Sequence, residues 1–182
     1  MTGEPVRLVL PDRALLLVAG MPGAGKSTLL AGLPADERVS VHDSDGPRTA
    51  LRRLLPGVPY GGYRWLVHLA HRAGVVAAAV SRVPVVVVHL PATDPGTRAA
   101  VLRLAALTGR SAHLLWLEVD PEHARRGQRE RGRVVPGRSF ARHAAAAARA
   151  PEDVGWASVT RLDRARAAGG LRLDHLTGVT HQ

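Results

Sequence analysis

The sequence contains no cysteine, and its aromatic residues are three Trp, two Tyr and one Phe. The lack of cysteine excludes a disulfide framework, thiol catalysis and thiolate metal sites. So few aromatic side chains disfavour a platform for stacking nucleic-acid bases. No apolar run approaches the roughly 20 residues that cross a bilayer, and the first residues lack the pattern of a signal peptide. We therefore expect a cytoplasmic protein that does not engage a membrane.

Lysine is almost absent as well, although the chain is basic. The formal net charge is +10, and Lys26 is the only lysine among 25 basic residues. Arginines concentrate between Arg125 and Arg142, where the single acid is Glu130. Guanidinium groups bind phosphate oxygens in pairs and stay charged at any working pH. This stretch is therefore a candidate phosphate-binding segment, and the alternative is a solvated helix face.

Short apolar runs alternate with stretches of helical period along the whole chain, which predicts an α/β fold with a parallel sheet and helices on both faces. Strands are expected at Ala14–Ala19, Val39–His42, Val85–His89, His113–Val119 and Ser158–Leu162. Helices are expected at Lys26–Leu33, Tyr63–Ser81, Gly96–Thr108, Pro121–Glu130 and Ser139–Ala150. Because domains average about 150 residues, residues 1–182 fit a single domain.

The segment GMPGAGKS at Gly20–Ser27 matches the pattern G-x-x-x-x-G-K-[ST], with an apolar strand before it and a helix after it. Its glycines permit turns that aim successive N–H groups at a phosphate, beside the N-terminus of the new helix. Lys26 would reach the β- and γ-phosphates, and the Ser27 hydroxyl would ligate Mg²⁺. The predicted cofactors are ATP and Mg²⁺, bound by Gly20, Gly23, Ala24, Gly25, Lys26, Ser27 and Thr28.

The sequence resembles P-loop kinases of the group that holds polynucleotide 5′-kinases, gluconate kinase, chloramphenicol phosphotransferase and zeta-toxin-like sugar kinases. The resemblance runs from Leu15 to about Leu162, through four segments at Gly20–Thr28, His42–Arg48, Val85–Arg98 and Leu114–Arg133. It implies a three-layer P-loop NTPase fold with a five-stranded, mainly parallel sheet. It also implies a short arginine-rich lid at about residues 121–142, and transfer of the γ-phosphate of ATP to a hydroxyl group.

The segment HDSDGPR at His42–Arg48 carries the chemistry that the resemblance implies. In polynucleotide-kinase-like proteins an aspartate followed three positions later by arginine lies after the second strand and next to the γ-phosphate. Asp45 and Arg48 have this spacing, so Asp45 is the candidate general base and Arg48 the candidate ligand of an acid group on the acceptor. Asp43 is a rival base or a ligand of Mg²⁺. The alternative is a polar turn with no catalytic role.

The arginine stretch would form the lid in these kinases. Arg126, Arg129 and Arg133 lie at i, i+3 and i+7, so they share one helical face that could meet the triphosphate. Such groups stabilise the charge that develops in the transition state. A nucleic-acid patch is the competing interpretation, because arginine also binds polynucleotides in a salt-sensitive way.

One feature departs from the group, which often has an aspartate at the end of the third strand. Here the strand ends on His89 and Leu90, and the next acid is Asp94, while Thr93 and Arg98 do fit the pattern. The metal site would then depend on Ser27 with Asp43 or Asp45. We expect an ATP-dependent kinase of a small molecule or a nucleic-acid 5′ end. The alternative is a regulatory or toxin-like nucleotide-binding module with little turnover.

Overall fold

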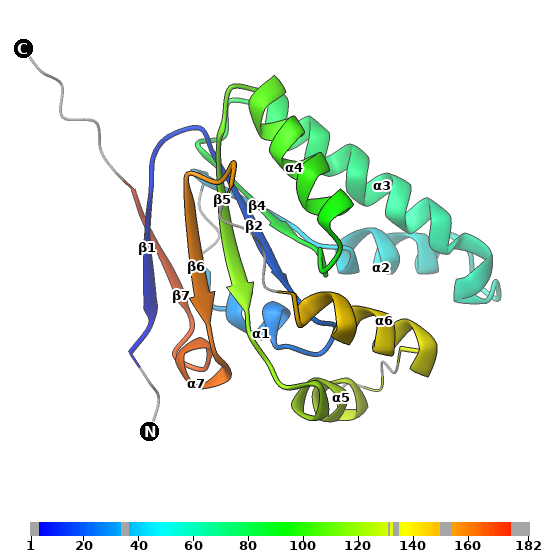
Figure 1. Cartoon of the computed structure of the whole chain (residues 1–182). Coiled ribbons are helices and arrows are strands. Elements are labelled where there is room, and N and C mark those ends of the chain that lie inside the picture. Colours follow the sequence, from blue (N-terminus) through cyan, green and yellow to red (C-terminus); the bar gives the residue numbers. More distant parts are fainter. Residues whose placement is uncertain (1–3, 34–36, 131, 133–134, 150–153, 176–182) are drawn as a thin grey trace, which may run out of the picture.

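The structure, a computed structural model, describes residues 4–33, 37–130, 132, 135–149 and 154–175. Its centre is a five-stranded sheet in the order β3-β4-β2-β5-β6, and every neighbouring pair is parallel (Figure 1). The strands are β2 (Ala14–Gly20), β3 (Val39–His42), β4 (Val85–His89), β5 (Ser111–Leu117) and β6 (Ser158–Leu162). The predicted sheet is therefore confirmed, with strand ends that move by two residues at most.

The central strand β2 is buried along its whole length. Its side chains alternate between the two faces of the sheet, as strand geometry requires. Leu16 and Val18 join one hydrophobic cluster, whereas Leu15 and Leu17 join the other. A strand buried on both faces reads as a continuous apolar run, which is why ALLLVAG was recognisable in the sequence.

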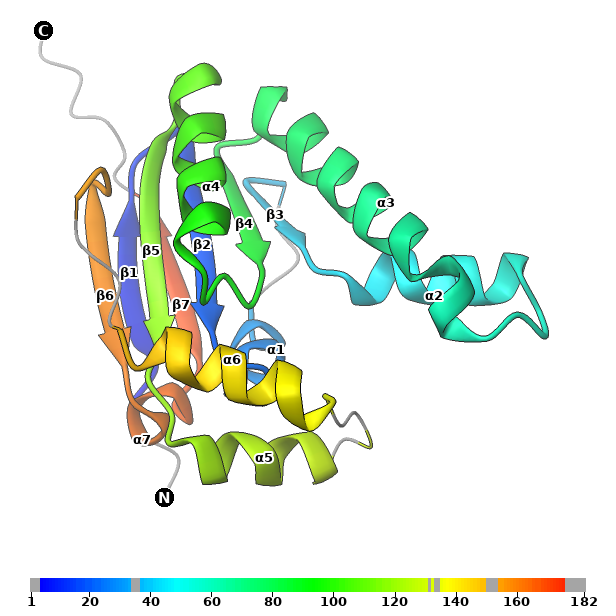
Figure 2. The ribbon, with the colours of Figure 1, turned by 45° about the vertical axis from the view of Figure 1, so that its right-hand side comes forward.

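Two helices cover one face of the sheet. They are α3 (Tyr60–Val80) and α4 (Pro95–Leu107), which contribute Val75, Ala79, Val101 and Ala105 to the core of that face. Figure 2 shows α3 running outward beyond the sheet together with the unpredicted helix α2 (Asp45–Leu54). None of the helices in the described part of the chain combines the length and apolar character of a membrane span.

The other face is covered partly by strands, which the sequence analysis did not predict. A two-stranded parallel sheet joins β1 (Val6–Leu10) to β7 (Leu171–His175), so the first and last strands of the described residues pair with each other. Leu10 and Leu171 are buried in the same core cluster as Leu29 of α1 (Lys26–Leu30). The short helix α7 (Arg164–Ala167) precedes β7.

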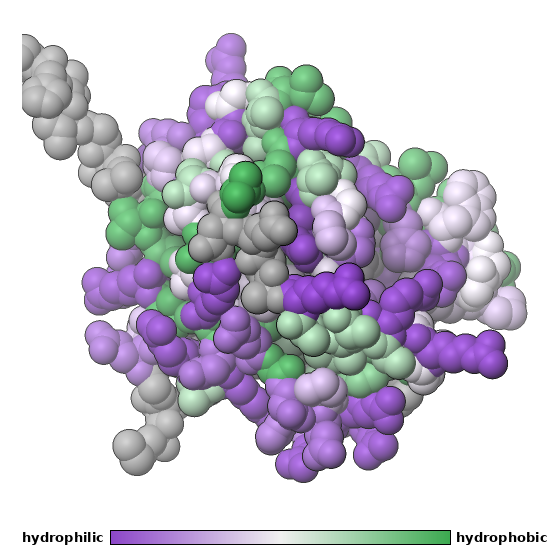
Figure 3. Space-filling model, viewed as in Figure 1, coloured by the Kyte–Doolittle hydropathy of each residue, from purple (hydrophilic) through white to green (hydrophobic). Residues whose placement is uncertain are grey.

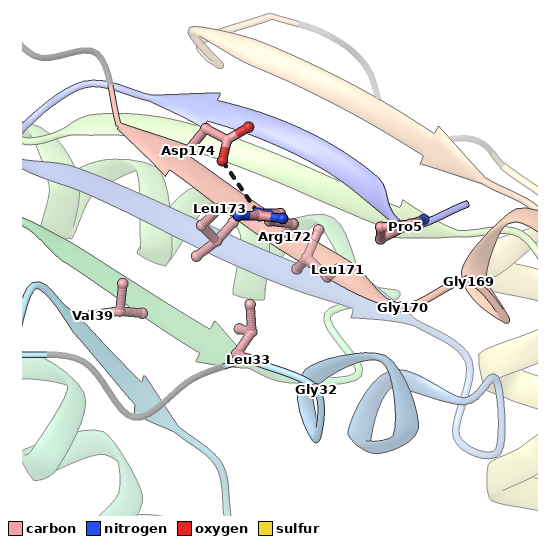
Figure 4. A pocket seen from close by; sticks show the side chains of 10 residues that line it. All are labelled: Pro5, Gly32, Leu33, Val39, Gly169, Gly170, Leu171, Arg172, Leu173 and Asp174. Carbon is pink, nitrogen blue, oxygen red and sulfur yellow. Dashed lines mark ion pairs between the residues drawn. The ribbon is translucent and has the colours of Figure 1, made fainter. Parts of the chain in front are cut away.

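A cavity of about 460 Å³ lies beside β7 (Figure 4). Its apolar lining comes from Leu33, Val39, Leu171 and Leu173. Its charged residues, Arg172 and Asp174, form an ion pair of 3.7 Å between Nε and Oδ1. No lining residue belongs to the segment Gly20–Thr28, so this cavity is separate from the predicted nucleotide site.

Two further helices follow β5 in the region of the predicted lid. They are α5 (Pro121–Glu130), which begins and ends as predicted, and α6 (Gly137–Ala147), which begins two residues early and ends three residues early. The helix after the glycine-rich loop is also shorter than predicted and ends at Leu30 instead of Leu33. The sheet edge at the carboxyl ends of β2, β4 and β5 thus borders α1, α5 and α6 (Figure 2).

Candidate functional site

The glycine-rich loop leaves the buried end of β2 and enters α1. Gly20, Gly23 and Gly25 have φ values of 141°, 91° and 97°, which L side chains adopt only with strain. Gly25 is the N-cap of α1, and none of the described side chains caps the helix there. The loop therefore has the backbone form that the motif predicted. Ala24 is buried, Ser27 is half-buried and Thr28 is exposed.

Lys26 is held tightly by the loop that precedes it. Its side chain is 5% exposed, and Nζ donates to the carbonyl oxygens of Gly20 and Met21, each at 2.8 Å. Such polar contacts offset part of the cost of burying an ammonium group, because burial of a charge without hydrogen bonds is costly. The only lysine of the chain is thus positioned above the loop before any nucleotide arrives.

The segment after β3 forms a helix start and not a free turn. Asp43 accepts hydrogen bonds at Oδ1 from the backbone N–H groups of Asp45 (2.9 Å) and Gly46 (3.2 Å). Asp43 therefore satisfies the first two N–H groups of α2, whose N-cap residue is Ser44 and whose first residue is Asp45. Both carboxylates are half-buried. The helix places Asp45 and Arg48 on its first turn, so their side chains lie on neighbouring positions of one face.

Arg48 is anchored by an aromatic side chain from the next helix. Its guanidinium carbon lies 4.4 Å from the ring centroid of Tyr60, within the range of a cation–π contact. Tyr60 in turn packs edge-on against Tyr63, which is buried, with ring centroids 5.5 Å apart. The first turns of α2 and α3 are joined in this way, and the orientation of Arg48 is restricted.

Three histidines gather beside these residues. His71 contacts the His42 carbonyl oxygen through Nε2 at 3.3 Å, and His42 Nε2 lies 2.8 Å from Ser40 Oγ. His89, the last residue of β4, has a buried Nδ1 with no hydrogen-bond partner among the described residues.

The pKa of His89 depends on charges from the phosphate loop as well as on its burial. Burial, and after it the positive charge of Lys26, lowers the pKa of His89 to about 4. Asp43 and Asp45 act in the opposite direction on the same pKa. His89 is therefore a neutral imidazole near pH 7, with Lys26 and both aspartates close enough to influence it.

The loop between β4 and α4 explains why Asp94 does not replace the missing carboxylate. Asp94 Oδ1 accepts a hydrogen bond from the Thr97 backbone N–H at 2.7 Å, which makes Asp94 the N-cap of α4. Arg98, which the resemblance singled out, donates to the carbonyl oxygens of Ala92 and Thr93 at 3.0 and 2.8 Å. Both residues hold the loop in place.

Thr93 contacts His143, a residue that the sequence did not indicate. The Thr93 side chain is 2% exposed, and Oγ1 lies 2.7 Å from His143 Nδ1 on α6. Burial lowers the pKa of His143, and Arg142 and Lys26 add to this effect. No local signal marks His143, because its partner lies 50 positions away and alanines follow it in the sequence.

Helix α5 packs directly on the phosphate loop. A Cβ atom at Gly127 would lie 2.7 Å from the Gly23 carbonyl oxygen, and a Cβ at Gly23 would lie 2.1 Å from the Ala124 carbonyl oxygen. Gln128, 4% exposed, donates from Nε2 to the Pro22 carbonyl oxygen at 2.8 Å and accepts at Oε1 from the Val135 N–H at 2.8 Å. The two glycines allow a backbone approach that any other residue would block.

The arginines of the predicted lid are only partly described. Arg126 and Arg129 are exposed on α5, and Arg133 lies outside the described residues. Figure 3 shows hydrophilic side chains gathered over α5. Steps of about 100° per residue place Arg126 and Arg129 on the side of α5 away from Gly127 and Gln128. The described arrangement therefore does not bring these two guanidinium groups onto the loop.

The chemistry of this sheet edge suits a nucleotide with its metal. The loop and Lys26 offer donors to phosphate, while Ser27 and Asp43 offer the oxygen ligands that Mg²⁺ prefers. Within the described residues, no group of three or more His, Asp or Glu side chains is arranged to hold a metal ion by itself. Oxygen atoms of phosphate and water would have to complete the coordination.

Comparison with known protein families agrees with this geometry. A family model described as an AAA domain, AAA_33, matches residues 15–151. These residues include the phosphate loop, both aspartates, His89 and α5. None of the curated proteins matches the sequence.

Solved structures share the fold at low sequence identity. A gluconokinase from Sinorhizobium meliloti 1021 is 18% identical, with a TM-score of 0.51 over 87% of this chain and 90% of its own. The tunicamycin resistance protein of Deinococcus radiodurans is 18% identical, with a TM-score of 0.52 over 88% and 98%. A structure of the PezAT toxin–antitoxin system of Streptococcus pneumoniae is 14% identical, with a TM-score of 0.61 over 85% and 70%. Together with the family match, these likenesses confirm the resemblance to P-loop kinases.

Proposed function

Since the chain belongs to the AAA_33 family of AAA domains, we propose that it transfers the γ-phosphate of ATP to a hydroxyl group of an acceptor. The observation that supports this most is the placement of Lys26. The Lys26 side chain is buried beside a loop whose three glycines have positive φ values, and two half-buried carboxylates follow β3 at the same edge of the sheet. A phosphate cradle beside carboxylates is the combination that phosphoryl transfer to a hydroxyl requires.

Asp45 is the proposed general base. As the oxygen–phosphorus bond forms, its carboxylate accepts the proton of the acceptor hydroxyl, and the bond between the γ-phosphorus and the bridging oxygen of ADP breaks. Asp43 is less suited to this role, because its Oδ1 already accepts two backbone hydrogen bonds. Arg48, restricted by its contact with Tyr60, is proposed to hold an acid group of the acceptor.

Mg²⁺ would be held by the hydroxyl of Ser27 and the carboxylate of Asp43, together with phosphate oxygens. The ion supplies neutralisation of the charge on the β- and γ-phosphates. Ser27 and Asp43 follow β2 and β3, which are parallel strands of one sheet, so both residues lie at the same edge.

The arginine-rich segment is proposed to act on the same phosphates. Arg126, Arg129 and Arg133 supply guanidinium groups that stabilise the charge of the transferring phosphoryl group. Since Arg126 and Arg129 are exposed on the far side of α5, this role requires a rearrangement of the segment when nucleotide binds. A nucleic-acid acceptor would use the same arginines for its backbone.

The second candidate is a nucleotide-binding regulatory or toxin-like module with little turnover. It is favoured by the end of β4, where the neutral His89 replaces the carboxylate that these kinases often have. Under this alternative ATP and Mg²⁺ bind, but transfer to every acceptor is slow.

Transfer of label from [γ-³²P]ATP with Mg²⁺ tests the two candidates. The acceptor pools are sugars, hydroxyl-bearing antibiotics, nucleosides and oligonucleotides with a 5′-hydroxyl. We expect one pool to take up label faster than phosphate is released to water, and Lys26→Ala to abolish this transfer and most ATP affinity. Label that reaches only water would favour the low-turnover module. Unchanged ATP affinity of Lys26→Ala in calorimetry would contradict both candidates.

A further inference from the structure

Helix α3 exposes apolar side chains along the side that faces away from the sheet. Its largest exposed apolar residues are Trp65 (62% exposed), Leu69 (57%), Val76 (46%) and Val80 (66%). At about 100° per residue these four positions fall within a strip about 60° wide. We call these four residues the α3 stripe. It runs for 16 residues of the helix, a length of about 24 Å.

The α3 stripe lies opposite the face that α3 buries against its own domain. Val67, His71, Val75 and Ala78 are buried on that inner face. The helix is therefore apolar on two opposite sides, whereas a surface helix normally has one apolar side. Nothing in the described part of the chain covers the outer side. An aligned exposed apolar strip of this kind is typical of a binding surface.

The charge around the α3 stripe is of one sign. Arg72 borders one edge of the stripe, and His68 and Arg64 lie progressively farther round the helix on the same side; all three are exposed. The other edge has the small residues Ala70, Ala73 and Ala77. Arg64 and Arg72 contribute to the lowered pKa of His68, after burial. The sequence has neither Asp nor Glu from Gly46 to Thr93. A partner with acidic residues beside its own apolar surface is therefore complementary.

We propose that the α3 stripe docks an amphipathic helix of a partner protein, with an acidic row along one edge of its apolar face. The length of the stripe matches about four helical turns, and the alanine edge allows a partner backbone to approach closely. The acidic row would lie on the side of Arg72, which borders the stripe, and of Arg64, which lies farther round the helix. This is the helix-in-groove mode of recognition, with anchors spaced at helical intervals.

Two other occupants fit the surface less well. In a symmetric pair of α3 helices the stripe would be centred near Arg72, so Arg72 of both copies would lie together and repel. A helix lying in a membrane surface carries basic residues on both sides of its apolar face, whereas here one edge has only alanines among its exposed residues. The observations therefore favour an acidic helix over a second copy or a lipid surface.

Two labelled synthetic peptides test the proposal by fluorescence anisotropy. Both form four-turn amphipathic helices with the same Leu and Ala apolar face, and one carries a row of Glu where the other carries Lys. We expect the Glu peptide to bind the full chain. Leu69→Glu should weaken binding at least tenfold, as loss of a central anchor does. The matched control is Val154→Glu, at an exposed valine (79%) outside α3, which should leave binding unchanged.

Charge reversal separates specific docking from general apolar adhesion. Arg72→Glu should lower the affinity for the Glu peptide and raise the affinity for the Lys peptide, each by about tenfold. Equal binding of the two peptides to the native chain would overturn the proposal. So would a dimer in light scattering that Leu69→Glu dissociates, or stronger retention on phosphatidylserine vesicles than on the peptide. Thermal unfolding and ATP affinity, measured on each variant, confirm that the fold is intact and keep this test independent of the proposed kinase activity.

Discussion

The phosphate loop and the segment after β3 lie at the same edge of the sheet, yet they are assembled in different ways. The two hydrogen bonds that Lys26 Nζ donates to Gly20 and Met21 go to residues five or six positions away. The β3 side instead combines a cap from Asp43, a ring from Tyr60 and imidazoles from β4 and α3. A site built from consecutive residues can be recognised in the sequence as a motif. In a site assembled from several elements, the closely spaced residues Asp43 and Asp45 can be recognised in this way, whereas a contributor from another strand, such as His89, cannot.

The largest expected effect concerns Asp45, which follows β3 and was predicted from the sequence. Asp45→Asn should lower the transfer rate by about 10²- to 10⁴-fold, the range of general base catalysis. ATP affinity should stay within about twofold, because the base acts on the acceptor. The rate is measured with the acceptor that takes up label, and the affinity by calorimetry.

Asp43→Asn is the matched variant for this comparison. It should lower the free energy of unfolding by about 1 kcal/mol or less, since Asn also caps helices. Its effect on transfer should be smaller and should depend on the Mg²⁺ concentration. If Asp45→Asn keeps full activity and Asp43→Asn is inactive, the general base is Asp43 and not Asp45.

The sequence predicted those features that depend on neighbouring residues. The five apolar runs correspond to the five strands of the sheet, and the segment with the glycine and lysine spacing forms the loop whose glycines have positive φ values. The β1–β7 pair was missed because VRLVL is short and its strand partner is 165 positions away. Pairing at that distance leaves no local pattern.

The functional neighbours of the loop were hidden for the same reason. Gln128 contacts Pro22 from 106 positions away, and His143 contacts Thr93 from 50 positions away. The polar segment at Asp43 was predicted to belong to the site, but the start of α2 within it was not predicted, because Gly46 and Pro47 disfavour helices. Pro47 is tolerated there because it lies in the first turn.

The next largest effect concerns His89, at the end of β4, whose place beside Asp43 and Asp45 the sequence did not indicate. Its pKa is about 4 in the folded chain and 6.5 when it is unperturbed. The unfolded chain therefore binds more protons between these values, so the neutral imidazole stabilises the fold above pH 6.5. This stabilisation is lost as the pH falls toward 4, up to about 3 kcal/mol.

His89→Gln removes the titration but keeps polar atoms at the end of β4. We expect the melting temperature of the variant to fall less than that of the native chain between pH 6.5 and 4. Differential scanning calorimetry at intervals of half a pH unit measures the difference. His42, His113 and His143 also have lowered pKa values and remain in both proteins, so their contribution cancels. Parallel pH profiles would show that His89 titrates near its ordinary value.

The smallest expected effect asks whether the phosphate loop is as self-contained as its local contacts indicate. Gly127→Ala would place a Cβ atom 2.7 Å from the Gly23 carbonyl oxygen, so α5 must shift away from the loop. Overpacking of this kind costs about 1–3 kcal/mol, and the gain in helix propensity from glycine to alanine returns up to about 1 kcal/mol. The free energy of unfolding, measured in urea, should fall by about 1–2 kcal/mol.

Gly137→Ala is the control for this variant, because Gly137 is also helical and a Cβ there meets nothing within 4 Å. It should be neutral or slightly stabilising. A loss in Gly127→Ala alone, accompanied by weaker ATP binding, would show that the loop depends on α5 for its shape. A loss of stability with unchanged ATP affinity would show that the loop keeps its form through Lys26 and its glycines. Equal stability of both variants would mean that α5 does not rest on Gly23 in solution.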